Sequence, residues 1–140
     1  MNNNTPSNEA PETYQARKKL KQLLYRQNYE IEEEVQLDTV TNNMGEEIWP
    51  PYRADMLLTK SFIIELDSKK LHGTHRRIVH DSWRDKNIKN QINLKTVRLL
   101  SKNVNVQSEK QILEEIEDQL KRFDNDNNDN KQIHSNKLRC

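Results

Sequence analysis

The chain has 140 residues, of which 32% are hydrophobic and 32% charged, and its 23 Lys and Arg residues nearly balance its 22 Asp and Glu residues. This composition predicts one domain with a small core, and a net charge of +1 gives no bulk electrostatic sign of nucleic-acid binding. A single cysteine, Cys140, excludes a disulfide framework and a cysteine-based zinc site. Because no apolar run is long enough to span a bilayer and the amino terminus lacks a signal-peptide core, we expect an intracellular, cytoplasmic protein without membrane contact.

Both ends of the sequence are polar and rich in Asn. Residues 1–11 and 124–140 contain almost no apolar side chains, so burial cannot offset the entropy lost when they become ordered. We therefore expect two disordered tails around a folded domain over residues 12–123.

The first predicted element is a helix over residues 12–27. Its apolar residues recur at helical spacing, and Lys and Arg fill the opposite side. Glu12 lies in the first turn, where a carboxylate faces the positive end of the helix dipole. Glu12 could therefore either stabilise the start of this helix or belong to a functional site.

The rest of the pattern is mostly of strand type. The predicted elements are strands 29–37, 52–58 and 61–66, a helix 75–91, a strand 94–100, and a last helix that begins with a Ser108–Gln111 capping box and ends near 123. A strand, a helix and a strand in succession indicate that the last strand runs parallel to an earlier one. The sequence thus predicts an α+β fold of order αβββαβα around a mixed four-stranded sheet.

Two acidic residues lie on opposite arms of the predicted hairpin. Asp55 and Glu65 could converge on one ion, and carboxylate oxygens are ligands that Mg²⁺ or Mn²⁺ prefers. Such a metal could polarise a phosphodiester and help to generate hydroxide from water. Asp67 follows on the same face as Glu65, and three carboxylates there would raise one another's pKa without a bound cation.

Histidines and basic residues follow the second hairpin strand. His72 has the chemistry of a general base or acid near neutral pH, although a loop histidine bonded to the backbone is the simpler alternative. His75 and His80 are weaker candidates for this role. The basic residues near the acids could hold DNA phosphates; they are Lys69, Lys70, Arg76, Arg77 and Arg84.

The helix after these residues carries Asp81 and Asp85 on one side, four residues apart. Two acids near an inward face should be paired with cations or be functional. Pairing along the helix with Arg77 and Arg84 is one interpretation, and a role in a site is the other.

These residues together resemble a known family of nucleases. The resemblance covers residues 12–104 and is carried by Asp55, Glu65-Leu66-Asp67, His72-Gly73, Asp81, Arg84-Asp85 and Val97-Arg98-Leu99-Leu100. It is to the very-short-patch-repair-like branch of the PD-(D/E)xK nuclease superfamily and to the EDxHD homing endonucleases.

The resemblance implies a Mg²⁺-dependent DNA endonuclease built on a mixed sheet flanked by helices. Asp55 would be the principal metal ligand, with Glu65 and the Leu66 carbonyl beside it, and His72 would be the catalytic histidine. The roles of Asp67, Glu12 and Asp81 in catalysis are implied in the same way. Three alternatives stay open: a DNA-binding or assembly module of this fold that does not cleave, a nuclease that acts on RNA, and activity that requires a homodimer or partner protein.

Overall fold

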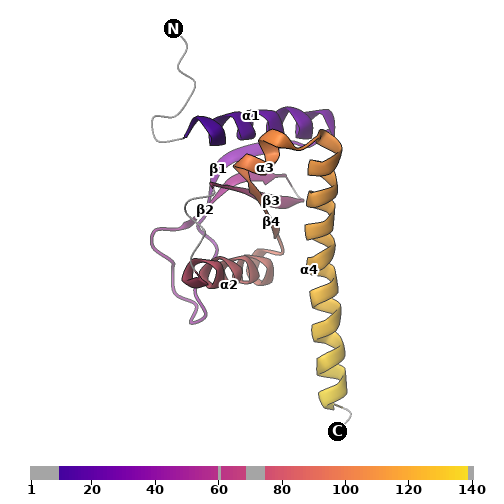
Figure 1. Ribbon diagram of the computed structural model, residues 1–140. Coiled ribbons are helices and arrows are strands. Elements are labelled where there is room, and N and C mark those ends of the chain that lie inside the picture. The colour runs from indigo at the N-terminus through magenta and orange to yellow at the C-terminus, as the bar shows by residue number, and fades with distance from the viewer. Residues whose placement is uncertain (1–9, 60, 69–74, 139–140) are drawn as a thin grey trace.

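The computed structural model describes residues 10–59, 61–68 and 75–138, with the backbone alone at 75–78 and 125–138. Its elements follow the predicted order, with one additional short helix (Figure 1). They are α1 (Pro11–Arg26), β1 (Ile31–Leu37), β2 (Tyr52–Leu58), β3 (Phe62–Asp67), α2 (His75–Ile92), β4 (Lys95–Leu100), α3 (Ser101–Val106) and α4 (Glu109–Leu138).

The four strands form one mixed sheet in the order β1-β2-β3-β4. The pairs β1–β2 and β2–β3 are antiparallel, and β3–β4 is parallel. Helix α2 connects the two parallel strands, as a crossover requires. The predicted α+β fold with a mixed four-stranded sheet flanked by helices is therefore confirmed.

One face of the sheet packs against α1, α3 and α4. Helix α1 supplies Ala16, Leu20, Leu23 and Leu24, all at most 1% exposed, at the spacing of a single helix face. Alternate positions of β2, β3 and β4 meet them, and the same cluster takes Ile112 and Ile116 from α4. This face holds the main apolar core.

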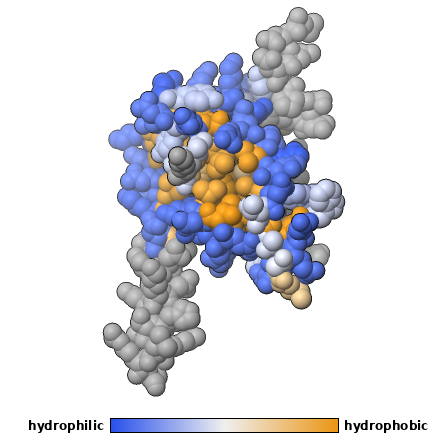
Figure 2. Space-filling view, turned by 180° about the vertical axis from the view of Figure 1, so that it is seen from behind, coloured by the Kyte–Doolittle hydropathy of each residue, from blue (hydrophilic) through white to orange (hydrophobic). Residues whose placement is uncertain are grey.

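The opposite face packs against α2 and is apolar over only part of its area. Ile63 from β3 and Ile88 from α2 are buried there, with several partly buried apolar neighbours. Seen from behind, apolar residues form a patch in the middle of the visible surface, inside a hydrophilic rim (Figure 2). Charged residues occupy the remainder of the α2 face, near the carboxyl end of β3.

Helix α4 begins with the predicted capping box. The Ser108 amide donates to Gln111 Oε1 at 2.9 Å, and the Gln111 amide donates to Ser108 Oγ at 3.2 Å. The backbone of this helix continues to Leu138. None of the helices in the described ranges has the length and apolarity needed to cross a membrane.

Candidate active site

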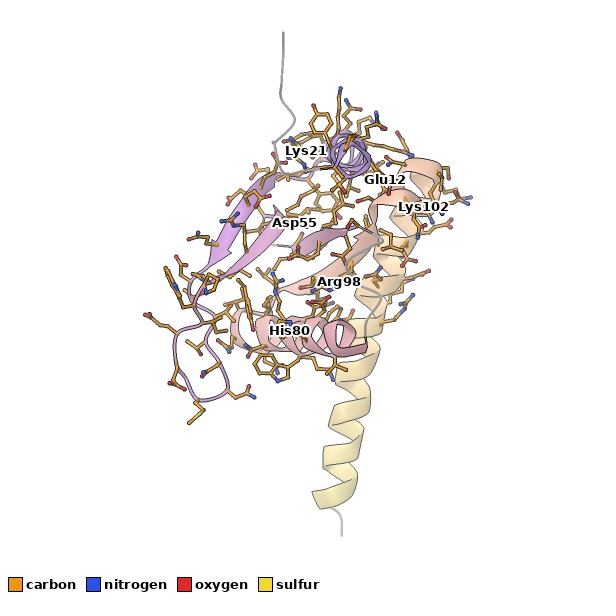
Figure 3. All side chains as sticks on the ribbon, turned by 60° about the vertical axis from the view of Figure 1, so that its left-hand side comes forward. Glu12, Lys21, Asp55, His80, Arg98 and Lys102 are labelled. Carbon is orange, nitrogen blue, oxygen red and sulfur yellow. The ribbon has the colours of Figure 1, made fainter. Side chains whose placement is uncertain are left out.

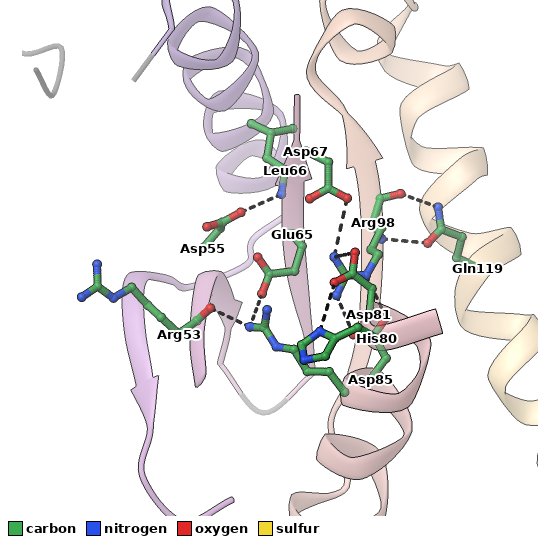
Figure 4. Close-up of polar contacts among 11 residues, drawn as sticks. Arg53, Asp55, Glu65, Leu66, Asp67, His80, Asp81, Asp85, Arg98 and Gln119 are labelled. Carbon is green, nitrogen blue, oxygen red and sulfur yellow. Dashed lines mark hydrogen bonds and ion pairs between the residues drawn. The ribbon is translucent and has the colours of Figure 1, made fainter. Parts of the chain in front are cut away.

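The site is built on a row of charged residues that crosses three neighbouring strands. Met56 pairs with Ile64 in the β2–β3 register, so Asp55 falls opposite Glu65, and Glu65 in turn pairs with Arg98 on β4. Side chains directly across a sheet lie on the same face. The three side chains therefore project together toward α2 (Figure 4).

Asp55 and Glu65 are held close together, as the hairpin predicted. Asp55 Oδ2 accepts a 2.8 Å hydrogen bond from the Leu66 amide, which fixes the carboxylate at the edge of β3. Glu65 is only 6% exposed. Its burial, together with the neighbouring Asp55 carboxylate, raises the pKa of Glu65 to about 9. Near neutral pH the metal-free protein therefore keeps Glu65 protonated beside Asp55, and a divalent cation would favour the ionised form of Glu65.

Arg84 on α2 contacts this pair through Glu65. Its Nη2 donates to Glu65 Oε1 at 3.1 Å and to the Arg53 carbonyl at 2.9 Å. The guanidinium also lies 4.9 Å from the ring centroid of Tyr52. Its Nε is buried and has no hydrogen-bond partner among the described residues. The sequence analysis assigned Arg84 to DNA phosphates, and the structure places it on Glu65.

A second arginine, Arg98, gathers the remaining acids. Its Nε and Nη2 donate to the two Asp85 oxygens at 2.9 and 2.8 Å, and its Nη1 lies 3.6 Å from both Asp67 and Asp81. Burial alone would lower the pKa of Arg98, but the Asp85 contact outweighs burial and raises it. Burial raises the pKa of Asp85 even with Arg98 beside it. Arg98 therefore acts as the internal counterion of three carboxylates.

This cluster gives the two helix acids a partner outside α2. Asp81 and Asp85 are paired with Arg98 on β4, a tertiary partner that the pattern along the helix did not suggest. Sequence reasoning singled out Arg98 only as part of a motif. The signal available was an arginine between the apolar residues Val97 and Leu99, which burial would force to find an acid.

Gln119 on α4 was not anticipated at all. Its Oε1 accepts from the Arg98 amide, and its Nε2 donates to the Arg98 carbonyl, both at 2.8 Å. The side-chain amide thus takes the place of a further strand beside β4, the edge of the sheet. It holds the backbone of the residue that carries the central guanidinium.

The other predicted site residues are not all brought to this cluster. Glu12 is exposed in the first turn of α1, and Figure 3 shows it apart from Asp55, near Lys102. His80 lies 4.0 Å from Asp81, with its side chain 65% exposed. His72, Lys69 and Lys70 lie outside the described residues, as do the side chains of His75, Arg76 and Arg77 within α2.

The donor chemistry of Asp55 and Glu65 fits a hard divalent cation. Within the described ranges no group of three or more His, Cys, Asp or Glu side chains is arranged to hold a metal. Mg²⁺, however, is commonly held by one or two carboxylates, with water and substrate phosphates completing its shell. Asp55, Glu65 and a carbonyl such as that of Leu66 would supply such a partial shell.

Comparison of the chain with models of protein families, with curated proteins and with solved structures gave no match. The interpretation of the site therefore depends on its geometry and on the sequence motifs.

Proposed function

We propose that the protein is a metal-dependent endonuclease that hydrolyses DNA phosphodiester bonds. The observation that supports this most directly is the pairing of Asp55 and Glu65, two carboxyl groups that adjacent strands hold together, with Glu65 buried and Asp55 partly exposed. Burial beside Asp55 disfavours the charged form of Glu65, and a carboxyl group with so perturbed a pKa is typical of functional sites. The resemblance of the surrounding motifs to PD-(D/E)xK nucleases agrees with this function.

In this proposal Asp55, Glu65 and the Leu66 carbonyl hold Mg²⁺. When bound, the metal would polarise the scissile phosphate and lower the pKa of a coordinated water. Asp55 is preoriented for this role by the Leu66 amide. To act as a ligand, Glu65, whose pKa is about 9 in the metal-free protein, would have to release its proton to solvent.

In this proposal Arg84 and Arg98 support the site through their contacts with its acidic residues. Arg84 lies beside Glu65 and its Nε has no hydrogen-bond partner among the described residues, so a small rotation would let the guanidinium meet a phosphate oxygen. Arg98 offsets part of the negative charge of Asp67, Asp81 and Asp85, which reduces the repulsion between those carboxylates and the substrate. His72 remains the candidate for proton transfer from the sequence motif.

The proposal is tested by nicking of a supercoiled plasmid. We expect the unmodified chain to nick DNA with Mg²⁺ or Mn²⁺ and not with EDTA, and Asp55→Ala to abolish nicking. Asp118→Ala, which changes an exposed acid on α4, should nick normally. Absence of metal-dependent nicking in the unmodified chain would refute the proposal.

The alternative is a binding or assembly module of the same fold that does not cleave. The contact between Arg84 and Glu65 favours it, because a built-in cation already neutralises one of the two proposed metal ligands. In that case Arg84→Met should bind Mn²⁺ more tightly than the unmodified chain in a calorimetric titration. If Arg84 instead helps to hold substrate phosphate, Arg84→Met should bind Mn²⁺ similarly but nick DNA more slowly.

A further inference from the structure

The basic segment of α1 is divided by helix geometry into two sets of side chains. Lys19 is used inside the fold, since its Nζ donates to the Val104 and Gln107 carbonyls at 2.7 and 2.6 Å. Arg26 forms an ion pair with Glu109 at the start of α4. These two cations fasten α1 to the carboxyl-terminal helices.

The other basic residues line a shallow groove of about 500 Å³ between α1 and β1. Together with two tyrosines of α1, these basic residues repeat at the spacing i, i+3, i+4, i+7 and i+11, which forms one face of the helix. The lining residues that matter here are Tyr14, Arg17, Lys18, Lys21 and Tyr25 from α1, with Glu33 from β1. In Figure 3, Lys21 lies on the side of α1 away from Lys102. We call this surface the α1 groove.

The α1 groove carries three cations and one acid. Glu33 accepts from Arg17 Nη1 at 2.9 Å and from Lys21 Nζ at 3.0 Å. Burial alone would raise the pKa of Glu33, but the bonds from Lys21 and Arg17 outweigh it and lower the pKa. Glu33 thus stays ionised and holds both cations at the groove, while Lys18 has no acidic partner in the described part of the chain.

Two tyrosines mark the ends of the α1 groove. The Arg17 guanidinium carbon lies 5.8 Å from the centroid of the Tyr14 ring, and Tyr25 is 53% exposed. They are eleven residues apart in α1, which at 1.5 Å per residue is about 16 Å. Bases stacked at 3.4 Å per nucleotide would fill this length with about five nucleotides.

We propose that the α1 groove binds a single-stranded nucleic acid, with the cations on its phosphates and bases stacked on the tyrosines. Cationic grooves with exposed aromatic rings suit single strands, because every base has a face that can stack. An acidic peptide would use the cations but has no groups for the two rings. The groove lies on the α1 side of the sheet and the acidic pair faces α2, so this binding does not depend on the proposed cleavage.

The test is fluorescence anisotropy of the full chain with labelled oligothymidine or oligouridine of about 15 nucleotides, in EDTA so that no cleavage occurs. We expect Tyr25→Ala to weaken binding about tenfold and Tyr25→Phe to restore it, since stacking needs only the ring. Lys18→Ala should lower the slope of log affinity against log salt by about 0.7, the effect of one phosphate contact. Lys102→Ala, a change of an exposed lysine on α3, is the matched control. Tighter binding of oligothymidine would identify DNA as the ligand, and tighter binding of oligouridine would identify RNA.

Three results would overturn the inference. One is equal affinity of Tyr25→Ala and the unmodified chain, and another is a Lys102→Ala effect as large as that of Lys18→Ala. The third is tighter binding of polyglutamate or of a duplex of equal length, which would assign the α1 groove to an acidic peptide or to double-stranded DNA. None of these measurements involves metal-dependent nicking. The nuclease proposal can therefore be refuted while this inference stands, and this inference can be refuted while the nuclease proposal stands.

Discussion

Replacing Arg98 by methionine should cost about 3–5 kcal/mol of folding free energy, the usual effect of removing one partner from a buried ion pair. The side chain is 21% exposed, and it forms a two-pronged contact with Asp85 at 2.8 and 2.9 Å. Asp85 is itself only 13% exposed at its side chain. Methionine keeps most of the volume, so the loss would come from carboxylates left without their cation.

Arg53→Met is the matched control. Arg53 is also a strand arginine paired with an acid, but its side chain is 58% exposed and lies 3.4 Å from Glu34. Exposed pairs contribute about 0–1 kcal/mol because water and salt screen them. The two variants therefore separate the effect of burial from the effect of losing a charge.

The assay is urea unfolding followed by tryptophan fluorescence. With an m value of about 2 kcal/mol/M, Arg98→Met should lower the midpoint by about 1.5–2.5 M and Arg53→Met by no more than about 0.5 M. The loss of unfolding free energy in Arg98→Met should be smaller at about pH 4, because protonation there removes the charge of the carboxylates that have lost Arg98. Equal midpoints for the two variants would refute the assignment of Arg98 as an internal counterion.

Three further predictions follow from other contacts. Glu65 has a folded pKa of about 9 against an ordinary value of 4.5, so the metal-free protein should lose stability as pH rises between these values. Glu65→Gln should flatten this dependence in urea midpoints measured in EDTA, and an unchanged slope would contradict the pKa. Gln119→Ala should cost about 1–3 kcal/mol, because it leaves the Arg98 amide and carbonyl without partners at the sheet edge. Calorimetric melting should show this loss, with no comparable loss in Gln15→Ala, an exposed glutamine on α1. Lys19→Met should cost about 1.5–3 kcal/mol through its two charged hydrogen bonds to the end of α3. Hydrogen exchange should then speed up in α3, and exchange unchanged there would argue against this role of Lys19.

The acidic pair was predictable because its geometry is local. A short hairpin fixes the register of its strands, so Asp55 and Glu65 had to lie across from one another. The capping box at Ser108 was predictable for the same reason, since its partners are three residues apart. In both cases the residues that interact are close in sequence or joined by one tight turn.

The partners of the arginines were not predictable in this way. Arg98 reaches Asp85 only because β4 pairs in parallel with β3 and α2 packs across both.

The sequence by itself determined the order of the elements, the mixed sheet and the opposition of Asp55 to Glu65. These features are predictable because hydrophobic periodicity and short turns are set by residues that lie close together in the sequence. Only the tertiary structure decided that Arg84 and Arg98 lie among the acids, that Gln119 closes the sheet edge, and that the basic residues of α1 divide between an internal fastening and an open groove. Those outcomes depend on how helices pack against the sheet, which residue spacing alone does not specify.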